Sequence, residues 1–172
     1  MWSDQLARGQ SKAEKRLSDL ETKDVINPAA RYTRASAQTL TSAGLAIINF
    51  DTLVVDPRAC VATGASWAYT APVAGVYQVE AAILLAGSTG WTEPEIAYLA
   101  VYKNGAAYAV LDYKADIQSN AQSVNVGLSG CTLVNLAAGE TLDIRGYQAS
   151  GGSIALVANA IYNHVSIFKV GS

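Results

Sequence analysis

The sequence predicts an all-β protein, a sandwich or jelly roll of about eight to ten strands preceded by a short N-terminal α-helix. After Pro28 the chain consists of short apolar or alternating runs rich in β-branched and aromatic residues, which favour strands. Glycine, proline and asparagine separate these runs, as they do at turns. Its 172 residues suffice for one core and a small appendage. We therefore expect a helical anchor over residues 1–30 and a head domain over residues 31–172.

The expected helix begins at Ser11-Lys12-Ala13-Glu14, a capping-box sequence in which the two side chains satisfy each other's backbone amides. It should end before Asn27-Pro28, because proline disfavours helical geometry in the preceding residue. One heptad register places apolar residues at its a and d positions, but Gln10 and Asp24 occupy a positions too. Two interpretations stay open, a short coiled coil and a lone amphipathic helix that docks on another protein. The residues assigned to this anchor are Leu6, Ala13, Leu17 and Leu20.

The expected strands follow one another at short intervals in the head domain. Asn104-Gly105 is the strongest hairpin signal, because both residues tolerate positive φ. Ala138-Gly139 separates two further apolar runs. The runs expected to form strands cover residues 47–51, 53–55, 67–69, 76–85, 99–102, 132–136, 141–145, 154–157 and 165–170.

Charge and hydropathy exclude several classes of partner. A net charge of −2 and a pI near 5.3 give no reason to expect nucleic acid as a partner. No run reaches the roughly 18 apolar residues of a membrane span, so we expect no membrane insertion. The Met1-Trp2-Ser3-Asp4 start lacks the regions of a signal peptide, and we expect the chain to begin there in a cytoplasm.

Charged residues are scarce in the head domain. Residues 1–24 carry ten of the 26 charged side chains, whereas residues 35–172 carry only 14. A soluble globular domain normally has about one-quarter charged residues, and this region has about one-tenth. We infer that the domain hides part of its surface against copies of itself.

Residues of the types used in catalysis are few in this sequence. We therefore expect a protein that is not an enzyme and that binds no cofactor and no metal. His164 is the single histidine, and we interpret it as a packed or interface residue. Cys60 and Cys131 are interpreted as buried small apolar residues, with a disulfide between them as the alternative. Phosphate loops and zinc motifs are not found. The acidic residues Glu93, Glu95, Asp112 and Asp116 are interpreted as solvated loop charges, with a calcium site as the alternative.

Four segments of the head domain carry a resemblance: Pro72-Val73-Ala74-Gly75-Val76-Tyr77-Gln78-Val79, Val101-Tyr102-Lys103-Asn104-Gly105, Leu133-Val134-Asn135-Leu136-Ala137-Ala138-Gly139-Glu140-Thr141-Leu142 and Asn163-His164-Val165-Ser166-Ile167-Phe168. They resemble the globular-head family of complement and tumour necrosis factor proteins, in the divergent form found in bacteriophage virion proteins. They occur in the order of the family, over roughly residues 32–170. The resemblance implies a ten-stranded jelly roll that closes as a homotrimer, with its last strand near the three-fold axis. It assigns Tyr147, Tyr162, Ile167 and Phe168 to the trimer interface.

A second expected surface contacts the host. Trp91 and Glu93 lie in a polar stretch after Gly87-Ser88-Thr89-Gly90, where an exposed tryptophan suits a glycan or protein ligand. The alternative is a tryptophan that folds back on the sandwich. Tyr113 is the third candidate binding residue, and it is equally suited to interface packing.

Together these expectations describe a structural protein of a phage virion, assembled in the host cytoplasm. Its anchor, residues 1–30, would bind other virion proteins, and its head would adhere to a host-surface glycan or protein as part of a tail fibre or tail tip. The alternative within this class is a capsid decoration or head-spike protein. From other classes come a free trimeric carbohydrate- or protein-binding module and, least favoured, a glycan hydrolase.

Overall fold

The computed structural model describes residue 12 and residues 28–88, 96–115, 117 and 124–171 of the chain. The described head domain is built of antiparallel strands in two main sheets. The strands are β1 (Ala29–Thr33), β2 (Thr39–Leu40), β3 (Gly44–Ile47), β4 (Thr52–Val55), β5 (Val61–Ala62), β6 (Ala68–Thr70), β7 (Gly75–Ser88), β8 (Ile96–Lys103), β9 (Ala106–Lys114), β10 (Val124–Leu136), β11 (Thr141–Ala149), β12 (Ile154–Ala155) and β13 (His164–Gly171). The all-β prediction is confirmed.

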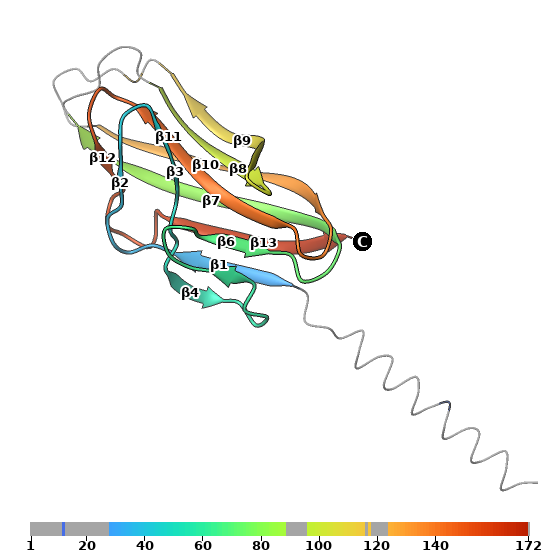
Figure 1. Ribbon diagram of the computed structural model, residues 1–172. Helices are drawn as coiled ribbons and strands as arrows, with labels where there is room; N and C mark the ends of the chain where they lie inside the picture. Colours follow the sequence, from blue (N-terminus) through green and yellow to red (C-terminus); the bar gives the residue numbers. More distant parts are fainter. Residues whose placement is uncertain (1–11, 13–27, 89–95, 116, 118–123, 172) are drawn as a thin grey trace, which may run out of the picture.

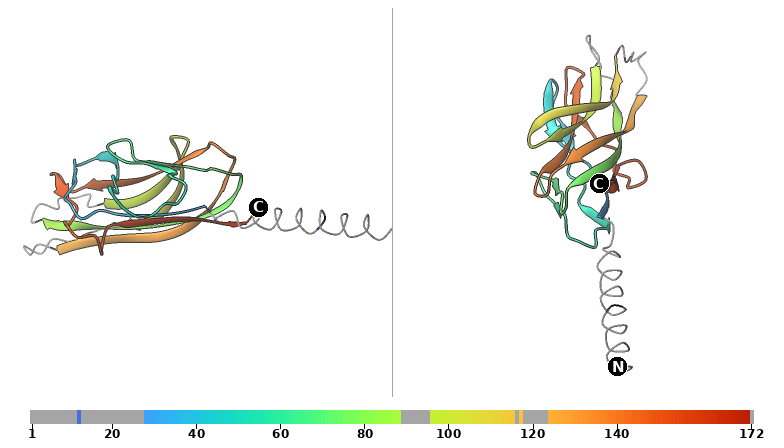
Figure 2. Two further views of the ribbon diagram at one scale, coloured as in Figure 1. Left: turned by 90° about the horizontal axis from the view of Figure 1, so that it is seen from below. Right: turned by 90° about the vertical axis from the view of Figure 1, so that its right-hand side faces the viewer.

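Two layers face each other across the core. The five-stranded sheet has the order β10-β7-β13-β1-β4, and the other sheet has the order β5-β6-β11-β8-β9 with β3 also paired to β11. Figure 1 shows β8, β9 and β11 together in one layer, and Figure 2 (left) shows the long strands β7, β10 and β13 together along the other side. The last strand therefore lies at the centre of the five-stranded sheet.

The residues that the sequence predicted at turns lie in turns of the structure. Asn104 and Gly105 both have positive φ, 50° and 78°, and they join β8 to β9 as the predicted hairpin. Gly139 has a φ of 85° between β10 and β11, which belong to different sheets. β1 begins at Ala29, two residues before the expected start of the head domain.

The core between the sheets is aromatic at one end. Trp67 is fully buried and meets the ring of Phe50 edge-on at 5.5 Å and that of Tyr32 at 6.4 Å. Tyr69 and Tyr77 form a second edge-on pair at 5.8 Å, and the Tyr77 hydroxyl donates to the carbonyl of Val73 at 2.7 Å. Edge-to-face pairs add to the free energy gained from burying large rings.

One buried amide ties β13 to its surroundings. The Asn163 Oδ1 accepts from the backbone amide of Leu84 at 3.0 Å. Its Nδ2 donates to the carbonyls of Val157 at 2.6 Å and Asn159 at 3.0 Å. Asn163 is completely buried, so water does not reach this place to replace its side chain as the hydrogen-bond partner of these backbone groups. Asn163 therefore fixes the chain at the start of the last strand.

Replacing Asn163 by alanine should lower the free energy of unfolding by about 3 kcal/mol or more, because each unsatisfied buried group costs roughly 1–3 kcal/mol. Denaturant titration measures this loss. The control is Asn159→Ala, whose side chain accepts one exposed hydrogen bond from the Ile161 amide, and we expect it to cost less than about 1 kcal/mol. Equal losses in the two variants would contradict the role given to Asn163.

Candidate functional site

The outer face of the five-stranded sheet is the first candidate site. Alternation along β13 buries Val165 and Ile167 and turns His164, Ser166 and Phe168 outward. The strand register then aligns three rows of outward side chains in the order β10, β7, β13 and β1. The rows are Leu133, Gln78, Phe168 and Ala29; then Cys131, Glu80, Ser166 and Arg31; and then Ser129, Ala82, His164 and Thr33. We call these twelve residues the assembly face.

Small side chains make the assembly face hollow. A hollow of about 550 Å³ lies over β7 and β10, between Glu80, Cys131 and His164. A neighbouring hollow of about 390 Å³ shares Ala82, Ser129 and His164 with it. Ala82 and Ser129 stand directly opposite each other, and neither fills the space above the sheet. The face can therefore receive side chains that project from another surface.

Exposed apolar side chains surround the assembly face. The edge strand β4 exposes Leu53, Val54 and Val55 to 59%, 51% and 46%. Ile161 and Tyr162 line the smaller hollow and are 77% and 47% exposed. At the opposite edge of the sheet Leu133 is 56% exposed. These exposed apolar side chains make the edges of the sheet candidates for contact with another surface.

Charges on the assembly face are few and have opposite signs. Glu80 and Arg31 flank Ser166 on neighbouring strands, and the Arg31 Nη1 donates to the Ser166 hydroxyl at 2.8 Å. At the rim Asp112 pairs with Lys114 at 3.3 Å and also accepts from the Ser129 amide at 3.2 Å. The face therefore carries little net charge to oppose close packing.

The four predicted interface residues do not lie together. Phe168 is half-buried on the assembly face, and Tyr162 lies at the smaller hollow. Ile167 points into the core and is 1% exposed. Tyr147 belongs to β11, in the opposite sheet, where it faces outward on a different face from Phe168. The physical reason is that neighbouring residues of a strand point to opposite faces and that β11 and β13 lie in different layers.

The outer face of the second sheet carries a row of tyrosines. Tyr147, Tyr98 and Tyr113 are aligned across β11, β8 and β9. Their rings are stacked, with centroid distances of 4.7 Å between Tyr98 and Tyr147 and 6.5 Å between Tyr98 and Tyr113. Burial raises the pKa of Tyr98. Tyr113, which the sequence singled out for surface binding, is 53% exposed at the end of this tyrosine row.

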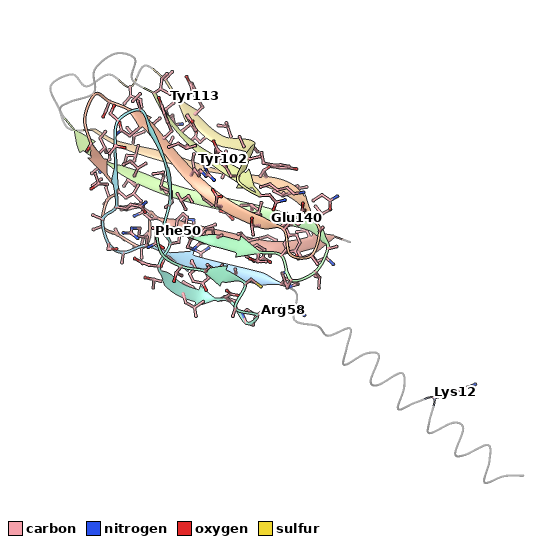
Figure 3. The ribbon with its side chains drawn as sticks, in the orientation of Figure 1. Lys12, Phe50, Arg58, Tyr102, Tyr113 and Glu140 are labelled. Atoms are coloured by element: carbon pink, nitrogen blue, oxygen red, sulfur yellow. The ribbon has the colours of Figure 1, made fainter. Side chains whose placement is uncertain are left out.

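Arg145 lies beside the tyrosine row in a fixed position. Its guanidinium lies 4.0 Å from the centroid of the Tyr102 ring, a cation–π contact. Asp143 holds it with two hydrogen bonds, from Nε at 2.6 Å and from Nη2 at 3.1 Å. These hydrogen bonds raise the pKa of Arg145, so the guanidinium stays charged. Figure 3 labels Tyr102 and Tyr113, which lie on the β8–β9 side of the sandwich.

Sequence reasoning missed Tyr98, Tyr102 and Arg145, although tyrosines at alternating positions of one strand could have indicated such a face.

The other residues singled out from the sequence have varied positions. Cys60 is buried as expected, whereas Cys131 is exposed because it points outward opposite Glu80, and both thiols are free. His164 is half-buried on the assembly face. Trp91, Glu93 and the anchor residues Leu6, Ala13, Leu17 and Leu20 lie outside the described residues.

Two kinds of feature were not found in the described part of the chain. It contains no group of three or more His, Cys, Asp or Glu side chains placed to hold a metal ion. Within the same residues no helix has the length and hydropathy needed to cross a membrane.

Comparison with known proteins identifies the fold. No family model and no curated protein matches the sequence. Among solved structures, the Eiger TNF from S. frugiperda is similar with a TM-score of 0.61 and 12% identity, covering 85% of this chain and 94% of that one. Crystal structures of murine APRIL at pH 8.0 and pH 8.5 are similar with TM-scores of 0.55, at 9% and 10% identity, covering 83% of this chain and 98% of theirs. The predicted TNF-like jelly roll is thus confirmed as a fold.

Proposed function

We propose that the chain is a non-enzymatic structural component of a bacteriophage particle. Its jelly-roll heads assemble as a homotrimer through the assembly face, and residues 1–30 attach the trimer to other virion proteins. The heads are displayed for adhesion to the host surface in a tail fibre or tail tip. A capsid decoration or head-spike position would use the same anchor and head on another part of the virion.

The assembly face carries this proposal. A sheet face with hollows over β7 and β10, few charges and exposed apolar side chains around it needs a partner surface to exclude water. The exposed apolar residues lie at separate places, on β4, on β10 and at Ile161 and Tyr162 before β13, rather than in one self-complementary patch. Two different surfaces that meet head to tail generate a closed ring when the rotation between copies closes. The family resemblance of the four segments supports a ring of three copies of the chain.

The resemblance also supports the proposal that the chain is part of a virion. The four segments match the divergent form of the family that occurs in phage virion proteins. The concentration of charge in residues 1–24 sets that region apart from the head and suits a separate attachment role. Immunogold images of the parent particle, labelled with an antibody to this chain, distinguish a tail position from a capsid position.

Deleting residues 1–27 should leave the homotrimer intact and abolish incorporation into the particle. The reason is that the sparse heptad offers too little apolar surface to hold three helices together unaided. Light scattering gives the mass of the truncated chain, and immunoblotting of purified particles measures its incorporation. If the truncated chain were a monomer, the N-terminal region would be the trimerisation element. If it were incorporated normally, the anchor would lie elsewhere.

A further inference from the structure

The second sheet has a hollow of its own on its outer face. Along β8 the outward residues are Tyr98, Ala100 and Tyr102, so a small side chain lies between two rings. Ala107 and Val110 on β9 stand opposite Tyr102 and Ala100 and form the side of the hollow. The space measures about 220 Å³. We call it the tyrosine hollow.

The walls of the tyrosine hollow are fixed by their neighbours. Tyr98 is stacked between Tyr147 and Tyr113, which restrains its ring. Tyr102 is restrained by the guanidinium of Arg145, itself held by Asp143. Ligand sites are commonly rigid, mainly apolar concavities with a few fixed polar groups. A site whose side chains are already ordered loses less conformational entropy on binding.

The charges around the tyrosine hollow are neutralised. On this face Asp143 pairs with Arg145 at 2.6 Å. At one end of the hairpin Lys103 pairs with Glu140 at 2.7 Å, and at the other end Lys114 pairs with Asp112 at 3.3 Å beside the assembly face. Hydrogen bonding by Lys103 also lowers the pKa of Glu140, which keeps that pair ionised. An ionic ligand would meet no unpaired opposite charge among these side chains. The hollow therefore suits a ligand that is neutral yet can form hydrogen bonds.

We propose that the tyrosine hollow binds a neutral saccharide. This inference rests on the proposed function, because it names the chemical class recognised by the displayed head. The C–H groups of a sugar ring contact the ring edges of Tyr98 and Tyr102 and the exposed side chains of Ala107 and Val110. The hydroxyls of the lining tyrosines Tyr98, Tyr102 and Tyr108 bond the sugar hydroxyls. Tyrosine combines a large apolar surface with a polar tip, and this ligand requires both.

The position of the tyrosine hollow fits this role. It lies on the outer face of the sheet opposite the assembly face, so it is separate from that face. Val110 and Tyr113, at its outer side, are 60% and 53% exposed. Several identical hollows on one assembly would also act together, since linked weak sites gain avidity.

The test uses the full chain on an array of immobilised neutral oligosaccharides, with sialylated and sulfated ones beside them. The neutral oligosaccharide that binds best is then titrated in free form by calorimetry. Ala107→Phe places a large side chain in the hollow from an exposed position. Ala106→Phe, also exposed and one residue earlier, does not line the hollow and is the matched control.

We expect a neutral oligosaccharide to bind the unmodified chain, Ala107→Phe to weaken it at least about tenfold, and Ala106→Phe to leave it within about twofold. Tyr98→Ala should weaken it similarly to Ala107→Phe. Absence of binding to any neutral sugar, binding restricted to anionic sugars, or equal affinities of Ala107→Phe and Ala106→Phe would overturn the inference. A change of molecular mass in Ala107→Phe would overturn it too, because another protein chain, not a sugar, would then cover the hollow.

Light scattering and particle incorporation of the same proteins separate this inference from the proposed function. If the chain is a trimer and is incorporated but binds no neutral sugar, only the saccharide site is wrong. If the chain is neither trimeric nor incorporated, the proposed function itself fails.

Discussion

Phe168→Asp should yield monomeric or insoluble protein in place of the homotrimer. Phe168 is half-buried on the assembly face, between Gln78 on β7 and Ala29 on β1. If three copies meet near the last strand, the substitution buries three carboxylates in a poorly hydrated space. Their desolvation and mutual repulsion should cost on the order of several kcal/mol per trimer. Light scattering measures the mass, and circular dichroism confirms that the sandwich is still folded.

The control for Phe168→Asp is Leu45→Asp. Leu45 is 39% exposed on β3, on the outer face of the opposite sheet, and lies across from Tyr147. Leu45→Asp introduces the same charge at a position that we expect to stay exposed to solvent in the trimer. The trimer of this variant should therefore persist. A stable Phe168→Asp trimer would show that the last strand faces solvent in the assembly and that copies meet elsewhere.

Trp67→Ala should lower the free energy of unfolding by about 3–5 kcal/mol, the range measured when large aromatic side chains are removed from a core. Trp67 is fully buried and contacts the rings of Phe50 and Tyr32, so its removal leaves a cavity and ends two edge-on contacts. Denaturant titration measures the change. A marginally stable domain would lose a large part of its stability.

Trp67→Phe is the matched variant, because it keeps most of the apolar volume. The Trp67 Nε1 is buried and donates to no described residue, so phenylalanine also removes an unsatisfied donor. We expect this variant to lose clearly less stability than Trp67→Ala. A loss below about 1 kcal/mol in Trp67→Ala would contradict the role assigned to this core, because cavity formation alone should cost more.

Local signals in the sequence predicted several strands and the main turns, but residues 48–51, expected in a strand, are not in one, and β1 and β5 were not among the expected runs. The Asn104-Gly105 hairpin and the runs that became β7, β8, β11 and β13 were recognised from composition and alternation alone. The four residues predicted for the interface do not share one face of the chain. Ile167 and Phe168 are adjacent in one strand, so period-two geometry already excluded a shared face. The separation of Tyr147 from Phe168 depends on which sheet each strand joins, and this is a long-range property.

The alignment of the tyrosine row across three strands was not predictable from the sequence, although the spacing of Tyr98 and Tyr102 in one strand could have indicated an aromatic face. Tyr98, Tyr113 and Tyr147 come from three strands, and their alignment depends on strand register. Register shifts between Leu99 and Ala100 and between Val101 and Tyr102 change which β9 residues share the outer face. A shift of one residue turns a side chain to the other face, so simple alternation fails across bulges.

The mass of the full chain in solution tests the central claim most directly, namely that heads assemble through the face formed by β10, β7, β13 and β1. Light scattering coupled to size exclusion at micromolar concentration should give three times the chain mass of 18.0 kDa. The value should hold on dilution, because an interface of this kind is buried and largely uncharged. A monomer mass at the same concentration would contradict the account.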